Sequence, residues 1–214
     1  NAWFVGEPFK VFYDYKKEGI WQLGEEAAAA ANGQEPGDIK VQDVDGNGVI
    51  TTDDRIIYSQ RPDVTFGFNN TFNYKGFDLS VFLYARLGQW IAYDYNTTYR
   101  INALENGGNV DYWTPENPTN AFPRPNKSKS YTQVTYYSTL KYEDGSFFKI
   151  RDITLGYTFK PELLKHLNLS KLRVYATAKN FFTFSKIDNY DPEQGGSISF
   201  PMTKQLVFGL NVEF

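Results

Sequence analysis

The last ten residues of the chain decide its fold class: Gln205-Leu206-Val207-Phe208-Gly209-Leu210-Asn211-Val212-Glu213-Phe214. One set of alternate positions is apolar throughout, from Leu206 to Phe214, whereas the other set includes Asn211 and Glu213. Successive side chains of a β-strand point to opposite faces, so this stretch predicts a strand with one apolar and one polar face. A tilted strand of about ten residues with this pattern can cross a membrane, although a soluble β-sandwich also uses it.

The same alternation predicts two strand pairs upstream. Residues 64–74 and 77–84 are joined by Lys75-Gly76, and a two-residue connection that contains Gly between alternating runs indicates a hairpin. Residues 150–159 and 172–180 form the second pair, joined by a predicted helical turn with a Pro near its start. Together with the terminal strand, these segments predict about five strands.

The predicted connections alternate in length. Tight connections lie at residues 75–76 and 160–170, whereas a long segment covers residues 89–145 and a medium one covers residues 185–202. This asymmetry is typical of outer-membrane barrels, whose long loops are extracellular. Five strands cannot close such a barrel, because open edges would leave backbone groups unpaired in lipid. We therefore predict an all-β fold that comprises the C-terminal antiparallel strands of a large transmembrane β-barrel, incomplete in this chain.

The first part of the sequence has a different character from the rest. We predict residues 1–63 to be an extracellular loop region and residues 64–214 to be the barrel section. Residues 5–9 and 11–15 look like short extended pieces, and the Ala-rich residues 25–31 predict a short helix that ends at Asn32-Gly33. A helix of this length is not stable alone, so it must pack against other segments.

Residues 43–54 carry a metal-type spacing. The stretch Asp43-x-Asp45-x-Asn47-Gly48-x5-Asp54 reproduces the EF-hand pattern of oxygen ligands, although an Asp stands where Glu is usual. The alternative is an Asp-, Asn- and Gly-rich loop that satisfies its own backbone through Asx turns without an ion. We expect a structural Ca²⁺ with these ligands: Asp43, Asp45, Asn47, the Val49 carbonyl, Thr51 and Asp54.

Composition narrows the possible function classes. The net charge of -3 argues against a nucleic-acid-binding protein, because no basic stripe is available for phosphates. Cysteine is absent, which excludes disulfides and thiol nucleophiles. The residues that follow Asn1 do not have the pattern of a signal peptide. Aromatic residues reach 18%, which suits the girdles of a membrane barrel but equally a Tyr-rich carbohydrate-binding β-sandwich.

Several motifs resemble one family in both residues and order. The resemblance is to the SusC/RagA family of TonB-linked outer-membrane proteins and spans nearly the whole chain. It rests on Gly37 to Ile50 with Asp54-Arg55, on Tyr112-Trp113-Thr114-Pro115-Glu116-Asn117-Pro118 with Phe122-Pro123-Arg124-Pro125, on Glu143 to Tyr157, on Leu172 to Phe184 and on the terminal Phe214.

The resemblance implies a nutrient transporter of the outer membrane. Members are expected to form a barrel of about 22 strands around an N-terminal plug, capped by a SusD-like surface lipoprotein and driven by the TonB complex. This chain lacks the plug, the TonB box and most strands, so transport of glycans or peptides would belong to a larger molecule. The rival interpretations are a secreted, calcium-stabilised β-sandwich that binds carbohydrate, and an adhesion module, which would need two calcium loops where the sequence has one.

The resemblance supplies no substrate contacts for this chain. Aromatic side chains of the long segment can stack on sugars or anchor a peptide. Most of them, however, are expected to pack the loop against itself and against a lid protein. The weak candidates for substrate contact are Trp90, Tyr93, Tyr95, Tyr112 and Trp113. No catalytic residue is predicted, because the single His166 lies in a predicted turn and neither a phosphate loop nor a nucleophile elbow is visible. The residues expected to line a water-filled lumen are Asp78, Ser80, Arg86, Arg173 and Lys179. The sequence does not decide which face of the strand that contains Arg173 points into the lumen.

Overall fold

The computed structural model describes residues 3–102 and 108–214, so residues 1–2 and 103–107 of the predicted loop regions lie outside the described part. The chain forms two compact units, each assembled from separate segments. The loop unit comprises Asn1–Arg61, Trp90–Asp144 and Gly195–Ile198, and the sheet unit comprises Pro62–Gln89, Gly145–Gln194 and Ser199–Phe214. The long segment that we grouped with the strands therefore clusters with the first sixty residues.

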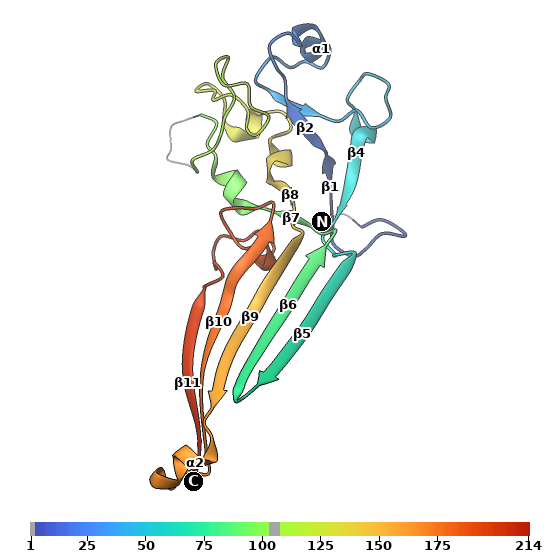
Figure 1. Cartoon of the computed structure of the whole chain (residues 1–214). Helices are drawn as coiled ribbons and strands as arrows, with labels where there is room; N and C mark the ends of the chain where they lie inside the picture. Colours follow the sequence, from blue (N-terminus) through green and yellow to red (C-terminus); the bar gives the residue numbers. More distant parts are fainter. Residues whose placement is uncertain (1–2, 103–107) are drawn as a thin grey trace. The chain divides into compact units, whose positions relative to one another are not determined.

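The sheet unit is built on one antiparallel sheet of five strands, in the order β11-β10-β9-β6-β5 (Figure 1). The sheet is open, as the prediction of an incomplete barrel requires. Its strands are β5 (Val64–Tyr74), β6 (Phe77–Leu87), β9 (Phe147–Thr158), β10 (Lys171–Ser185) and β11 (Gln205–Glu213). The connection between β10 and β11 contains the short 3-10 helix η6 (Pro192–Gln194).

The tight connections follow from their residues. Lys75 and Gly76 both have positive φ, at 48° and 91°, as a two-residue type I′ hairpin turn requires. Between β9 and β10, α2 (Pro161–Leu164) begins with Pro at a first-turn position and continues into η5 (Lys165–Leu167). Both connections lie at the same end of the sheet as Phe214 (Figure 1). His166 is exposed in this turn, as predicted.

The strand register separates the side chains of the sheet into two faces. Residues that pair directly across strands share a face, and the pairs Phe72–Leu79, Leu79–Leu155 and Leu155–Ala176 extend one apolar face across four strands. Its rings remain exposed, with Phe208 at 74% and Phe72 at 61%. The opposite, polar face carries all five residues expected to line a lumen: Asp78, Ser80, Arg86, Arg173 and Lys179.

An ion pair on the polar face crosses a glycine. The Arg173 guanidinium on β10 donates to both carboxylate oxygens of Asp78 on β6, at 2.9 Å from Nε and 2.5 Å from Nη2. It spans the intervening strand at Gly156, where a Cβ atom would lie 2.5 Å from both Arg173 Nη2 and Asp78 Oδ1. Likewise, Gly209 on β11 leaves room for the Tyr175 ring. These contacts settle the facing of the Arg173 strand.

The loop unit contains three two-stranded sheets among its described residues. β1 (Val11–Tyr15) pairs with β4 (Arg55–Ser59), β2 (Lys17–Ile20) with β3 (Ile39–Val41), and β7 (Trp90–Ala92) with β8 (Tyr142–Asp144). The helical elements of the unit are α1 (Glu26–Ala31), η1 (Thr52–Asp54), η2 (Asp94–Thr98), η3 (Tyr131–Gln133) and η4 (Tyr137–Lys141).

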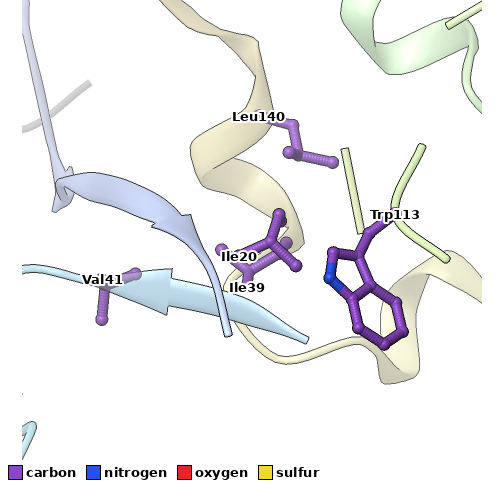
Figure 2. Close-up of a cluster of buried hydrophobic side chains, with 5 residues drawn as sticks. All are labelled: Ile20, Ile39, Val41, Trp113 and Leu140. Carbon is purple, nitrogen blue, oxygen red and sulfur yellow. The ribbon is translucent and has the colours of Figure 1, made fainter. Parts of the chain in front are cut away.

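A small apolar core holds this unit together. Ile20 of β2 and Ile39 of β3 lie beside Leu140 and the indole of Trp113 (Figure 2). The predicted helix is α1, which ends at Asn32-Gly33 and packs through the buried Ala29. The prediction of an extended piece at residues 5–9 was wrong: these residues form a turn, because Gly6 takes a φ of 89° and Pro8 provides no N–H for pairing.

No helix within the described ranges has the length and apolar character needed to span a bilayer.

Substitution of Gly156 tests the ion pair that crosses it. Gly156→Ala should lower the stability of the protein by about 1–3 kcal/mol, because the new methyl group displaces the Asp78–Arg173 pair. Gly67→Ala is the matched control: it lies on the same face, and its Cβ would sit 3.6 Å from the Phe82 ring, an ordinary contact. Urea unfolding of the purified protein measures both changes. Equal effects of the two substitutions would contradict the steric argument.

Candidate functional site

The predicted calcium loop folds so that its carboxylates converge. One oxygen from each of Asp43, Asp45 and Asp54 lies within 4.8 Å of the others. The turn is made possible by Gly46 and Gly48, which have φ values of 73° and 83°. Asp43 Oδ1 accepts the Gly46 N–H at 2.8 Å, and Asp43 Oδ2 accepts the Gly48 N–H at 2.7 Å. These bonds fix the carboxylate that begins the pattern.

Asp54 closes the loop from the opposite end. Its side chain is fully buried and accepts the N–H groups of Val44 at 2.8 Å and Thr51 at 2.7 Å. The bond from Thr51 is the main reason that the pKa of Asp54 lies below its ordinary value, so the carboxylate is ionised at neutral pH. The Thr51 hydroxyl in turn accepts the Asp53 N–H, which completes a capping box at η1.

The remaining residues of the pattern are more open to solvent. Asp45 and Asn47 are exposed; Asp45 accepts the Asn47 N–H at 3.0 Å, and Asn47 Oδ1 accepts the Val49 N–H at 2.8 Å. Asp45 also accepts the Asn47 side-chain N–H at 2.7 Å. A carboxylate that accepts two such bonds still has lone pairs for a cation. The geometry therefore fits a hard cation, and it also contains the Asx turns of the ion-free alternative.

The candidate aromatic residues occupy different environments. Trp113 is buried in the core at 4% exposure, and its indole N–H donates to Gln22 Oε1 at 2.8 Å. Tyr93 is also buried, whereas Trp90 and Tyr95 are half-buried and Tyr112 is 43% exposed. Within the described structure, Trp113 and Tyr93 thus serve packing, and Tyr112 is the most accessible of the five.

A buried ionic cluster stands on the polar face of the sheet. Lys149 on β9 is fully buried, and its Nζ lies 2.7 Å from Asp191 Oδ2 and 2.7 Å from Glu193 Oε2. Arg151 adds a second contact to Glu193 at 3.1 Å, and the Thr183 hydroxyl donates to Asp191 at 3.2 Å. Because both acids precede β11 in the connection from β10, the cluster fastens that connection to the strands.

Sequence reasoning missed this cluster. By strict alternation Lys149 would share a face with the apolar Ile153 and Leu155, but a register shift in β9 between Asp152 and Ile150 places it on the polar face. Its partners lie more than 40 residues later in a predicted loop. A charged side chain that is taken out of water needs opposite charges and hydrogen bonds close by. The cluster meets that demand with two carboxylates.

An open antiparallel sheet with one apolar and one polar face is typical of a section of an outer-membrane β-barrel. No family model matches the chain. It is 31% identical to the TonB-dependent receptor P3 of Formosa agariphila over 98% of its own length and 22% of that receptor. It is also 31% identical to the TonB-dependent receptor SusC of Bacteroides thetaiotaomicron over 80% of its length and 17% of that protein. The RagAB peptide transporter structure superimposes with a TM-score of 0.73 at 24% identity, covering 99% of this chain and 24% of that one.

These relatives agree with the motifs and the fold. The chain belongs to the SusC/RagA family of TonB-dependent outer-membrane receptors. It spans less than a quarter of the length of the relatives described above.

Removal of the Lys149 charge tests the role of the ionic cluster. Lys149→Met in the complete receptor leaves Asp191 and Glu193 without their shared cation, which should cost about 3–5 kcal/mol and expose the β10–β11 connection to protease. Lys179→Met is the matched control, because Lys179 lies 3.8 Å from Asp152 and is 46% exposed, so its loss should cost at most about 1 kcal/mol. Limited proteolysis and urea unfolding give the two readouts. An unchanged cleavage rate in Lys149→Met would refute the fastening role.

Proposed function

We propose that this chain forms part of a TonB-dependent importer of glycan or peptide nutrients that works with a SusD-like surface lipoprotein. The single observation that carries the proposal is the division of the sheet into an exposed apolar face and a polar face with paired charges. Such a sheet suits hydrocarbon on one side and a water-filled lumen on the other. The similarity to TonB-dependent receptors supports transport as the process in which this sheet takes part.

The polar face supports a lumen that contacts polar solutes. Asp78 and Arg173 form their ion pair there, Thr154 and Thr177 share a hydrogen bond at 2.8 Å, and Lys149 meets its carboxylates on the same side. Charged groups of this kind are costly in contact with lipid. On β5 and β6 the apolar face, by contrast, offers only aliphatic and aromatic side chains and Asn70.

The connections support an orientation for the barrel. The β5–β6 turn and the β9–β10 turn are short and lie at one end of the sheet, whereas the β6–β9 and β10–β11 connections are long. In outer-membrane barrels the short turns are periplasmic and the long loops extracellular. The loop unit, which the β6–β9 connection helps to build, would then face the outside of the cell.

The relatives support part of the proposal about the substrate. One solved relative is described as the RagAB peptide transporter, which favours peptide for that protein and keeps peptide among the substrates here. Exposed loop residues such as Tyr112 are available for a lid protein or a substrate. The remaining barrel, the plug and the TonB complex would complete the transporting unit in the outer membrane.

The soluble β-sandwich is the weaker alternative. It requires a second sheet against the apolar face, and the described residues of the sheet unit contain one sheet only. An adhesion module is weaker still, since the described residues hold one cluster of acidic groups with metal spacing.

Growth experiments test the import function. In the bacterium that encodes the receptor, its deletion should abolish growth on at least one defined oligosaccharide or peptide as sole carbon source, and inactivation of TonB should have the same effect. Reintroduction of the intact gene should restore growth, and the tagged receptor should copurify with a surface lipoprotein. Growth of the deletion strain equal to the parent on both nutrient classes would refute import.

We also propose a structural Ca²⁺ in the loop of residues 43–54, where three carboxylates already converge. The ion would draw on the side chains of Asp43, Asp45, Asn47, Thr51 and Asp54 and on the Val49 carbonyl. Its effect would be to neutralise the mutual repulsion of the carboxylates and so hold the loop in place.

Substitution of one exposed ligand tests the calcium proposal. Asp45→Asn should weaken Ca²⁺ binding to the complete receptor by about tenfold or more, because a ligand charge is lost while the side-chain shape is kept. Asp53→Asn is the control, since Asp53 is exposed and adjacent to the ligand Asp54 but lies outside the ligand pattern. Isothermal titration of chelator-treated receptor with Ca²⁺ measures both. If the two variants bind alike, or if the intact receptor shows no saturable uptake, the ion-free loop is the correct interpretation.

A further inference from the structure

The loop unit contains a pocket that none of the candidate sites explains. It has a volume of about 250 Å³ and lies between α1, the β2–β3 pair and the loop of residues 43–54. Ile39 and Val41, two members of the core in Figure 2, contribute to its apolar lining together with Ile50 and Ala28. The polar lining comes from other residues, among them Gln34, Lys40, Asp43 and Tyr136.

Two polar groups in this lining are left available to a ligand. Gln34 is only 7% exposed, yet its side-chain amide has no hydrogen-bond partner among residues 3–102 and 108–214. The Tyr136 hydroxyl likewise has no hydrogen-bond partner among the described residues. Both groups line the pocket, so a ligand that enters it can form hydrogen bonds with the amide and with the hydroxyl.

The charges around the pocket are already matched. Lys40 Nζ lies 3.0 Å from Glu25 Oε1 and 3.8 Å from Glu18 Oε2, and it also stands 4.7 Å above the Trp21 ring. Both oxygens of Asp43 accept backbone N–H groups within its own loop. A charged ligand would have to disrupt these pairs, whereas a neutral ligand would not.

We propose that this pocket binds a single neutral sugar ring. A pyranose presents a C–H face to the aliphatic lining, and its adjacent hydroxyl groups each donate and accept, as the Gln34 amide and the Tyr136 hydroxyl also do. An aliphatic peptide side chain would leave both polar groups without partners. The proposal rests on the proposed import function, because the pocket would make the loop unit a contact point for glycan nutrients.

Binding to the purified complete receptor in detergent tests the proposal. Methyl α-D-glucopyranoside and methyl β-D-galactopyranoside serve as probes, with N-acetylglutaminamide as the neutral peptide-like comparison, and isothermal titration as the readout. At least one glycoside should bind saturably, and Gln34→Leu should weaken that binding about tenfold or more. Gln133→Leu, which alters an exposed glutamine outside the pocket, should leave the binding unchanged.

A second pair of variants guards against misfolding of Gln34→Leu. Ala28→Leu extends a side chain toward the pocket from α1 and should weaken glycoside binding severalfold, whereas Ala27→Leu on the same helix lies outside the lining and should not. Equal binding by these two variants, no saturable glycoside binding, or a preference for N-acetylglutaminamide would overturn the proposal. Because titration needs neither TonB nor a lipoprotein, loss of import in cells with intact binding would count against the import function and not against the pocket.

Discussion

Hydrogen bonding along every strand edge is the constraint on which the structure depends. In a bilayer no water replaces a missing backbone partner, so each strand must be paired on both sides and must divide its side chains between two environments. β9 illustrates both conditions, because β6 and β10 pair with it along most of its length while Leu155 and Thr154 point to opposite faces. β5 and β11 each have one neighbour among the described residues, which is the expected state of a section of a larger barrel.

The strand architecture could be predicted from the sequence where local chemistry determines it. Lys75-Gly76 permits positive φ at both turn positions, and Pro161 suits the start of a helical turn, so both connections were predicted correctly. β10 runs to Ser185, beyond its predicted end at residue 180. The register shift between Lys179 and Phe182 breaks the alternation at that point, which ended the prediction too early. In the loop unit, the extended piece predicted at residues 11–15 is confirmed as β1, but its pairing with β4 was missed because the two strands are far apart in the sequence.

The candidate site could likewise be predicted only where residues close in the sequence determine it. Spacing alone indicated that Asp43, Asp45 and Asp54 would converge, since the loop is short and its glycines allow the turn. Spacing could not show that Trp113 would be enclosed by Ile20 and Leu140, because that contact joins three distant segments. The place of the Gln34 amide in the pocket lining was equally unpredictable, since it depends on how α1, β2 and β3 pack together.

The enclosure of Lys149 has a consequence for the way this receptor can diverge. Its ammonium group lies between the carboxylates of Asp191 and Glu193, so loss of Lys149 alone leaves two enclosed carboxylates without their shared cation, and loss of either acid leaves the lysine with a single carboxylate partner. Evolution would therefore pass through simultaneous or compensated changes at the three positions. Among homologous receptors, we expect these residues to be inherited as a set, or replaced together by uncharged side chains, and correlated variation in aligned sequences would be their signature.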